Sequence, residues 1–314
     1  MNKAKLVAAE DELPKDSYSV MELQLTSLAA TAAFADAFMR TGRKLDALVC
    51  NAAVYLPNQP KPTWTDDGYE ESFGVNHLAH HLLVRKLLPV LAKNKGSRCI
   101  IVGSITGNSN TVGGGAVLPL ADLDQLQGLA GPAGGKRVAM LDGKAFNGAK
   151  AYKDAKLANM MTVLELHRRY HASTGVFFTS MYPGCIAETA LFRQKRGWFR
   201  WFFPIFMKYV TGGYVSEEEA GERLASTVAD AATAKSGVYW SWNGGARTVG
   251  WLDFRKNVVR GAGGAGGELF ENEPSDLVRD PAKAKKLFDL CDAAVAPYLA
   301  PGTVPKQARV PAMA

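Results

Sequence analysis

Apolar positions along this chain alternate between short continuous runs and longer stretches of helical period. The continuous runs cover residues 45–50, 98–104, 175–182 and 236–242. Runs of this length without polar alternation are typical of strands buried on both faces of a parallel sheet. Residues 17–25 add a further predicted strand. The pattern therefore predicts five strands, with 236–242 as the last.

Between these runs, apolar residues recur every three or four positions, which predicts amphipathic helices. The predicted helices cover residues 3–13, 27–39, 67–93, 147–171 and a segment opened by a capping box at 216–219. Strands that alternate with helices in this order predict an α/β fold, a doubly wound Rossmann-type parallel sheet.

Two stretches are longer than a connection between a strand and a helix requires. Residues 105–147 are rich in glycine, and residues 191–214 are rich in aromatic side chains. We expect both to lie at the carboxyl ends of the strands, where open α/β sheets bind ligands. Trp201, Phe202 and Phe203 are too closely spaced to share one amphipathic face. Residues 198–209 are expected to be either a packed subdomain core or a lid that faces a ligand or a membrane. We predict one domain over 1–295 and a disordered, proline-rich tail over 296–314.

Composition narrows the class of protein only a little. The 314 residues carry a net charge of +7, but no basic run with interleaved aromatic residues indicates a nucleic-acid groove. The four cysteines lie far apart in sequence and are expected to be reduced thiols. Neither a transit peptide nor an apolar stretch long enough to span a membrane is recognisable.

Tyr152 and Lys156 carry the clearest chemical signal. Residues four apart on a helix share a face, where the ammonium is expected to lower the pKa of the phenol and make it a proton donor. Ser104 ends a buried strand and supplies a hydroxyl for the reacting oxygen. A Tyr and a Lys at this spacing are common by chance, but with Ser104, Asn51 and Asn76 they indicate a hydride-transfer site.

These residues resemble those of the short-chain dehydrogenase/reductase superfamily. Longer motifs are similar to the light-dependent protochlorophyllide oxidoreductase family, and they lie at residues 102–108, 149–154, 182–187, 215–221 and 235–243. The resemblance covers about residues 5–243. It implies light-driven, NADPH-dependent reduction of protochlorophyllide to chlorophyllide in chloroplasts.

The resemblance also assigns roles to individual residues. Those implied for catalysis are Asn76, Ser104, Tyr152 and Lys156. Those implied for cofactor binding are Asn51, Ala52, Ala53, Tyr152, Lys156, Pro183, Gly184 and Ile186. Those implied for substrate contact are Thr106, Tyr182, Cys185 and Phe192, with Cys185 beside the pigment. A homo-oligomer and peripheral membrane contact through 198–209 are further expectations.

The chain departs from the family pattern at its start. The family begins with a strand, a TGxxxGxG-type turn, a helix and a second strand, none of which is recognisable here. A sheet of order 3-2-1-4-5-6 would then lack the two strands between 3 and 4, and the helix N-terminus that binds pyrophosphate with them. Gly261–Gly266 formally satisfies GxGxxG, but we predict a loop there.

Single positions depart from the family pattern as well. Gln24 replaces an Asp that contacts adenine, and Glu188 replaces a Thr that holds the cofactor, which Thr189 partly offsets. In the helix that carries Asn76, Ala79 and His81 replace a Gly and a Phe.

Other readings of the sequence stay open at this point. The chain could be a truncated paralogue that binds the pigment without turnover, or a short-chain reductase of a bulky apolar ketone that needs no light. His77 and His80 lie near Asn76, but no third ligand at a suitable spacing indicates a metal site. We expect both histidines to be packed or solvated.

Overall fold

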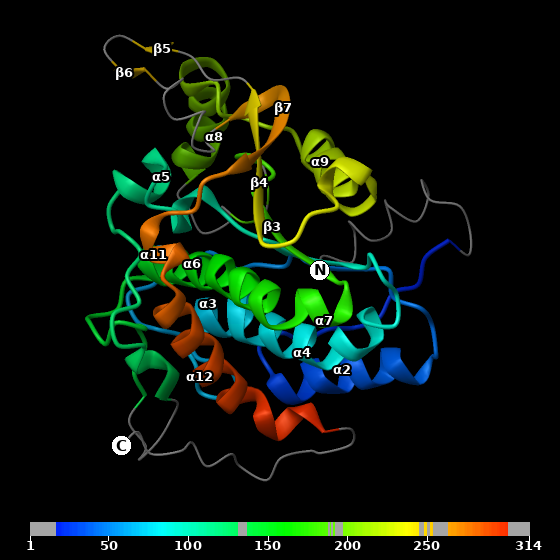
Figure 1. Ribbon diagram of the computed structural model, residues 1–314. Coiled ribbons are helices and arrows are strands. Elements are labelled where there is room, and N and C mark those ends of the chain that lie inside the picture. Colours follow the sequence, from blue (N-terminus) through cyan, green and yellow to red (C-terminus); the bar gives the residue numbers. More distant parts are fainter. Residues whose placement is uncertain are drawn as a thin grey trace.

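A five-stranded sheet forms the centre of the computed structural model, which describes residues 17–130, 137–187, 189, 191, 197–244, 248–249, 252–253 and 263–300 (Figure 1). Its strands, in spatial order, are β1 (Ala47–Cys50), β2 (Arg98–Val102), β3 (Phe177–Met181), β4 (Val238–Gly244) and β7 (Gly264–Asn272). The first four are parallel, and β7 pairs antiparallel with β4. The predicted α/β fold with a mostly parallel sheet is confirmed.

Helices cover both faces of this sheet. On one face lie α2 (Leu28–Arg40), α4 (Ala79–Leu91), α6 (Gly148–Leu166) and α12 (Pro281–Leu299), and α9 (Glu217–Ala229) packs near β2 on the other (Figure 1). The shorter described elements are α3 (Glu71–Phe73), η1 (Gly74–Leu78), η2 (Ile105–Gly107), α5 (Val112–Gly115), η3 (Gln127–Ala130), η5 (His167–His171), α7 (Ala172–Thr174), α8 (Gly197–Ile205), η7 (Phe206–Thr211), η8 (Ala231–Thr233), β5 (Thr248–Val249), β6 (Leu252–Asp253) and α11 (Asp276–Arg279).

The predicted helix starts agree with the observed caps. Ser27 Oγ accepts a hydrogen bond from the backbone N–H of Ala30, and Ser216 Oγ accepts one from Glu219. The Asn147 side chain accepts from two N–H groups at the start of α6. These side-chain acceptors satisfy backbone donors that a helix cannot pair internally. The helix predicted over 3–13 lies outside the described residues.

The strand predicted at 17–25 is wrong. The structure has no strand there, and the sheet ends at β1 among the described residues. In the expected order this segment would be separated from β1 by two strands that the described residues do not supply. A strand needs a neighbouring strand for its backbone hydrogen bonds. Residues 17–25 have no such neighbour among the described residues, so they stay irregular despite their good strand propensity.

A second correction concerns the prediction for the glycine-rich segment around Gly264. Gly264 begins β7, so 236–242 is not the last strand and the loop predicted over Gly261–Gly266 is wrong for its described part. A Cβ on Gly264 would lie 1.8 Å from the Gly212 carbonyl oxygen, and one on Gly267 would lie 2.1 Å from the Gly244 nitrogen. Glycine is therefore required because backbones approach too closely for a side chain.

The C-terminal boundary lies further along than predicted. Helix α12 continues to Leu299, with Val295 and Tyr298 buried, so 296–299 are helical rather than disordered. The rest of the predicted tail, 301–314, lies outside the described residues. Pro297 is tolerated near the end of the helix because the apolar face of α12 packs against α4 and α6.

The two long stretches differ in character. Residues 105–147 contribute Leu123, Leu126, Leu129 and Leu141 to the main core, so this stretch is part of the domain's packing. Among the described residues of 191–214, the exposed large hydrophobic side chains are Trp198, Trp201, Phe202, Ile205 and Tyr209. These positions recur at the period of one helical face, whereas the adjacent Phe203 is half-buried and does not belong to this exposed set. None of the described helices is long and apolar enough to cross a membrane.

Candidate active site

Polar groups meet at the carboxyl ends of three adjacent parallel strands. Asn51 follows β1, Ser104 follows β2 and Pro183 follows β3, and the three strands are neighbours in the sheet. Helix α6 packs along β2 and β3 and carries Tyr152 and Lys156 on its buried side. The site expected from sequence is therefore assembled by strand order and by one long helix.

Ser104 is held at the end of β2 by local hydrogen bonds. Its Oγ lies 2.9 Å from Oγ1 of Thr106 and accepts a bond of 3.2 Å from the Thr106 backbone N–H. A hydrogen bond with Ser104 also acts to lower the pKa of Tyr152. The structure thus brings together the serine and tyrosine hydroxyls that the sequence predicted.

The pKa of the Tyr152 phenol is raised, not lowered as expected from the nearby lysine. Burial is the main cause, and the hydrogen bond with Ser104 opposes it only in part. The Lys156 ammonium lies 5.7 Å from the centre of the Tyr152 ring, and its Nζ donates to the Val102 carbonyl at 2.7 Å. The phenol therefore keeps its proton at neutral pH, as a proton donor must before negative charge develops on a ligand.

Lys156 itself is strongly affected by burial. Desolvation lowers the pKa of its ammonium from 10.5 to about 8. The side chain is 3% exposed, and its nitrogen reaches a backbone carbonyl at the end of β2. The Lys156 nitrogen therefore lies at the end of β2, the edge at which open α/β sheets bind ligands.

A pH effect on stability follows from Lys156. Its pKa of about 8 in the folded protein lies below the value of 10.5 for the free side chain. Between these two pH values the unfolded chain binds more protons, so this residue makes the free energy of unfolding rise with pH, by at most roughly 3 kcal/mol. We expect Lys156→Met to lose that rise in urea titrations between pH 7.5 and 10. The exposed Lys283→Met should keep it; equal slopes for both variants would refute the assignment.

Asn76 lies in the π-helical turn η1 and is fully buried. Its Oδ1 accepts from the Val54 N–H at 2.7 Å, and its Nδ2 donates to the Val54 carbonyl at 2.8 Å. Its backbone carbonyl accepts from Asn159 Nδ2 at 3.0 Å, one turn beyond Lys156. Asn76 thus connects the segment after β1 to the helix of the tyrosine and lysine, which makes it a positioning residue.

The turn after β3 is built around a glycine. Gly184 has φ +117°, and a Cβ there would lie 2.2 Å from Cγ2 of Val215. The neighbouring Cys185 pairs with Tyr214 in an isolated bridge, and burial raises the pKa of its thiol to about 12. A negative charge on this thiol would raise the pKa of Tyr152 and of Tyr182 further.

The other positions singled out from sequence lie at the ends of β1 and β3, in local hydrogen-bonded turns, or outside the described residues. Asn51 and Ala52 are exposed and Ala53 and Ile186 half-buried, so the ends of β1 and β3 are open to a ligand. Gln24 donates to Thr26, and Thr189 closes a turn on the Ile186 carbonyl. Phe192 and Glu188 lie outside the described residues.

Three residues that contact the predicted site residues were not identified from the sequence. The Tyr55 ring lies 4.9 Å from that of Tyr152, and Asn159 donates to Asn76. Buried Arg223 donates to the Pro183 carbonyl at 2.8 Å and fixes the turn after β3. Asn159 lies three positions after Lys156, a spacing that could have indicated it, whereas Arg223 gave no local signal.

Gly107 sets the distance between the strand end and α6. A Cβ at this position would lie 2.6 Å from the Leu157 nitrogen and 2.7 Å from the carbonyl carbon of Lys156. We expect Gly107→Ala to lower the free energy of unfolding by about 1–3 kcal/mol, because the helix must move away from Ser104. Urea titration measures that loss. Gly221→Ala, which meets open space on α9, serves as the control, and equal stability of the two variants would contradict the packing argument.

Comparison with solved structures supports the α/β fold. A short-chain dehydrogenase/reductase from Serratia marcescens aligns over 76% of this chain and 81% of its own, with a TM-score of 0.52 and 17% identity. A dehydrogenase/reductase from Sinorhizobium meliloti aligns over 76% and 79%, with a TM-score of 0.52 and 18% identity. The short chain dehydrogenase family model matches residues 1–116. The sheet and the helices of this chain thus share the fold of these two enzymes.

Closer relatives narrow the class to one family. The chain is 51% identical over 92% of its length to the chloroplastic protochlorophyllide reductase of Marchantia paleacea, 48% over 93% to that of Cucumis sativus, and 50% over 92% to that of Chlamydomonas reinhardtii. It belongs to the protochlorophyllide reductase family. The alignments span 59%, 69% and 67% of those relatives' own lengths.

Proposed function

We propose that this chain performs the light-driven reduction of protochlorophyllide to chlorophyllide, with NADPH as cofactor, in chloroplasts. The single observation that carries the proposal is the buried group of Ser104, Tyr152 and Lys156 at the strand ends, in a chain about half identical to chloroplastic protochlorophyllide reductases. In this proposal the pigment absorbs the light, and the protein supplies orientation and a proton.

The residues present fit the nicotinamide end of the cofactor. Lys156 directs a buried cation to the end of β2, and the exposed backbone after β1 offers room beside it. When bound, the cofactor supplies a hydride. The residues described here do not include a glycine-rich turn between a strand and a helix next to β1, so groups for the pyrophosphate are not assigned.

Tyr152 is the proposed proton donor. Its raised pKa keeps the phenol neutral until charge develops nearby, and the Ser104 hydroxyl then stabilises the phenolate that remains. Cys185 is proposed to position the pigment. Because its thiol stays protonated near neutral pH, it offers a weak donor and an apolar contact rather than a nucleophile.

The exposed face of α8 and η7 is proposed to cover the pigment or to contact a membrane surface. Trp198, Trp201 and Tyr209 are each more than 60% exposed, which is unusual for aromatic side chains grouped on one helical segment. The aromatic residues can lie flat against an apolar ring system or at a lipid headgroup boundary.

A flash assay tests the proposed function. The purified chain is mixed with protochlorophyllide and NADPH, and the red absorption band of the pigment is followed after each flash. Conversion to chlorophyllide in the light, and none in the dark, is expected. Pigment binding without conversion would overturn the proposal in favour of a pigment-binding scaffold, and turnover of bulky ketones in the dark would favour a light-independent reductase.

A further inference from the structure

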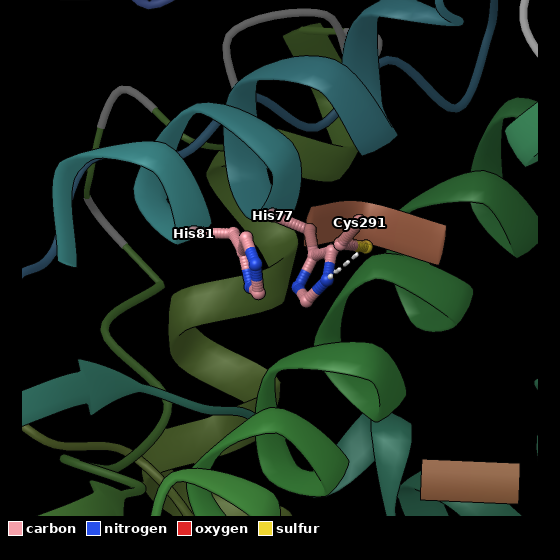
Figure 2. A group of neighbouring side chains, drawn as sticks. All are labelled: His77, His81 and Cys291. Atoms are coloured by element: carbon pink, nitrogen blue, oxygen red, sulfur yellow. Dashed lines mark hydrogen bonds between the residues drawn. The ribbon is translucent and has the colours of Figure 1, made fainter. Parts of the chain in front are cut away.

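A second cluster of reactive side chains lies beside Asn159, the residue that donates to the Asn76 carbonyl. His77 from η1, His81 from α4 and Cys291 from α12 point toward one another (Figure 2). One donor atom from each lies within 4.8 Å of the other two, and all three side chains are buried. The cluster could not be recognised from the sequence alone, because His77 and Cys291 are 214 positions apart.

Both imidazoles are already oriented by an oxygen acceptor. Nδ1 of His77 lies 2.8 Å from Oδ1 of Asn159, and Nε2 of His81 lies 2.8 Å from Oδ1 of Asp292. Metal-binding histidines usually have such a partner on one nitrogen, which fixes the ring and leaves the other nitrogen for the cation. The other nitrogen of His77 thus faces Cys291, and the Asp292 contact holds the His81 ring in place.

The hydrogen-bond network fixes the tautomer of His77. Asn159 Nδ2 donates to the Asn76 carbonyl, so Asn159 Oδ1 must accept from His77 and the proton of that ring lies on Nδ1. Nε2 of His77 then presents a lone pair toward Sγ of Cys291, 3.5 Å away. The thiol proton occupies the position that a cation would take.

We propose that His77, His81 and Cys291 bind one monovalent copper ion, Cu⁺. Binding replaces the thiol proton: Cys–SH and Cu⁺ give Cys–S–Cu and a released H⁺. Thiolate and imidazole are the donors that soft cations such as Cu⁺ select. One thiolate neutralises one monovalent charge, so the occupied site is electrically neutral inside the core.

Charge and ligand number favour Cu⁺ over Zn²⁺. A Zn²⁺ ion bound by one thiolate would leave one positive charge uncompensated. The nearby Asp292 carboxylate does not balance that charge, because it already forms an ion pair with Arg85 at 2.8 Å. Structural zinc sites usually have four ligands, and this cluster supplies three. Buried unbalanced charge is costly, so the divalent ion is disfavoured.

The donors need only a small movement to close on an ion. With bonds of about 2.0–2.3 Å, three donors in trigonal geometry stand roughly 3.5–3.8 Å apart. The His77–Cys291 pair already has this separation, and the others reach at most 4.8 Å. A shift of about 1 Å of α12 along α4 is within the adjustment that packed helices make.

Binding of Cu⁺ to the purified chain tests the proposal. Under anaerobic conditions with a competing Cu⁺ chelator, we expect one ion per chain, and X-ray absorption should show one sulfur and two nitrogen donors. Cys291→Ala and His81→Phe should each weaken binding at least tenfold. Cys99→Ala removes another buried thiol, outside the cluster, and should bind as the unmodified chain does.

Three outcomes would overturn the proposal. The first is the absence of stoichiometric Cu⁺ binding by the folded chain. The second is equal affinity in Cys291→Ala and Cys99→Ala. The third is tight binding of Zn²⁺ without Cu⁺, which would refute the charge argument. If a variant does not fold, the X-ray absorption spectrum of the unmodified chain decides the ligand set.

Discussion

Tyr152→Phe should reduce the rate of light-driven pigment reduction by about 10²–10⁴-fold, the range that a general acid contributes. The substitution removes one oxygen and keeps the ring, which stays packed 4.9 Å from Tyr55. Pigment binding and the free energy of unfolding should therefore change little. Flash photolysis with the pigment band as signal measures the rate, and fluorescence quenching measures pigment affinity.

Tyr170→Phe provides the matched control for this experiment. Tyr170 lies at the end of the same helical segment, next to Arg85 and Phe288, and is remote from the strand ends. Its substitution should leave the rate unchanged. A Tyr152→Phe variant with an undiminished rate would show that another group donates the proton, and Cys185 would be the first to examine.

Arg223→Met should destabilise the folded protein by about 3–5 kcal/mol, because it removes one partner of a buried charged network. The guanidinium donates to Glu219 Oε1 at 2.6 Å and to the carbonyls of Pro183, Gly264 and Gly266 at 2.8, 2.7 and 2.9 Å. Methionine fills similar volume but donates nothing, so three carbonyls lose a donor and a carboxylate loses its cation.

Urea denaturation followed by circular dichroism measures this loss. Arg279→Met removes ion pairs of an exposed arginine with Asp276 and Glu273 and should leave the midpoint nearly unchanged. If both variants unfold at the same urea concentration, Arg223 does not hold β7 to the turn after β3.

Much of the fold could be predicted because its signals are local. The runs at 98–104 and 175–182 became β2 and β3, since continuous apolar residues suit a sheet covered on both faces. The capping side chains of Ser27 and Ser216 marked helix starts correctly, because a cap depends on residues three positions away. Ser104, Tyr152 and Lys156, singled out by their motifs, lie together in the structure at the end of β2, and their roles stay predictions.

The errors arise where structure depends on distant partners. Residues 17–25 have strand-like composition, but a strand needs a neighbour to pair with, and sequence pattern does not show whether one is present. Strand β7 was missed because glycines have low strand propensity, and only its fit against Gly212 and Gly244 explains them. The pKa of Tyr152 follows burial, which the spacing of Lys156 does not reveal.

Helix α12 has a consequence for how the chain folds during synthesis. Its Leu287 and Phe288 complete the core, and its Tyr298 carbonyl accepts from Lys86, 212 positions earlier. At ~5–20 residues per second, a ribosome needs about 10–40 s to cover that interval. For that time the apolar faces of α4 and α6 lack this cover, which leaves the nascent chain prone to aggregation until α12 emerges.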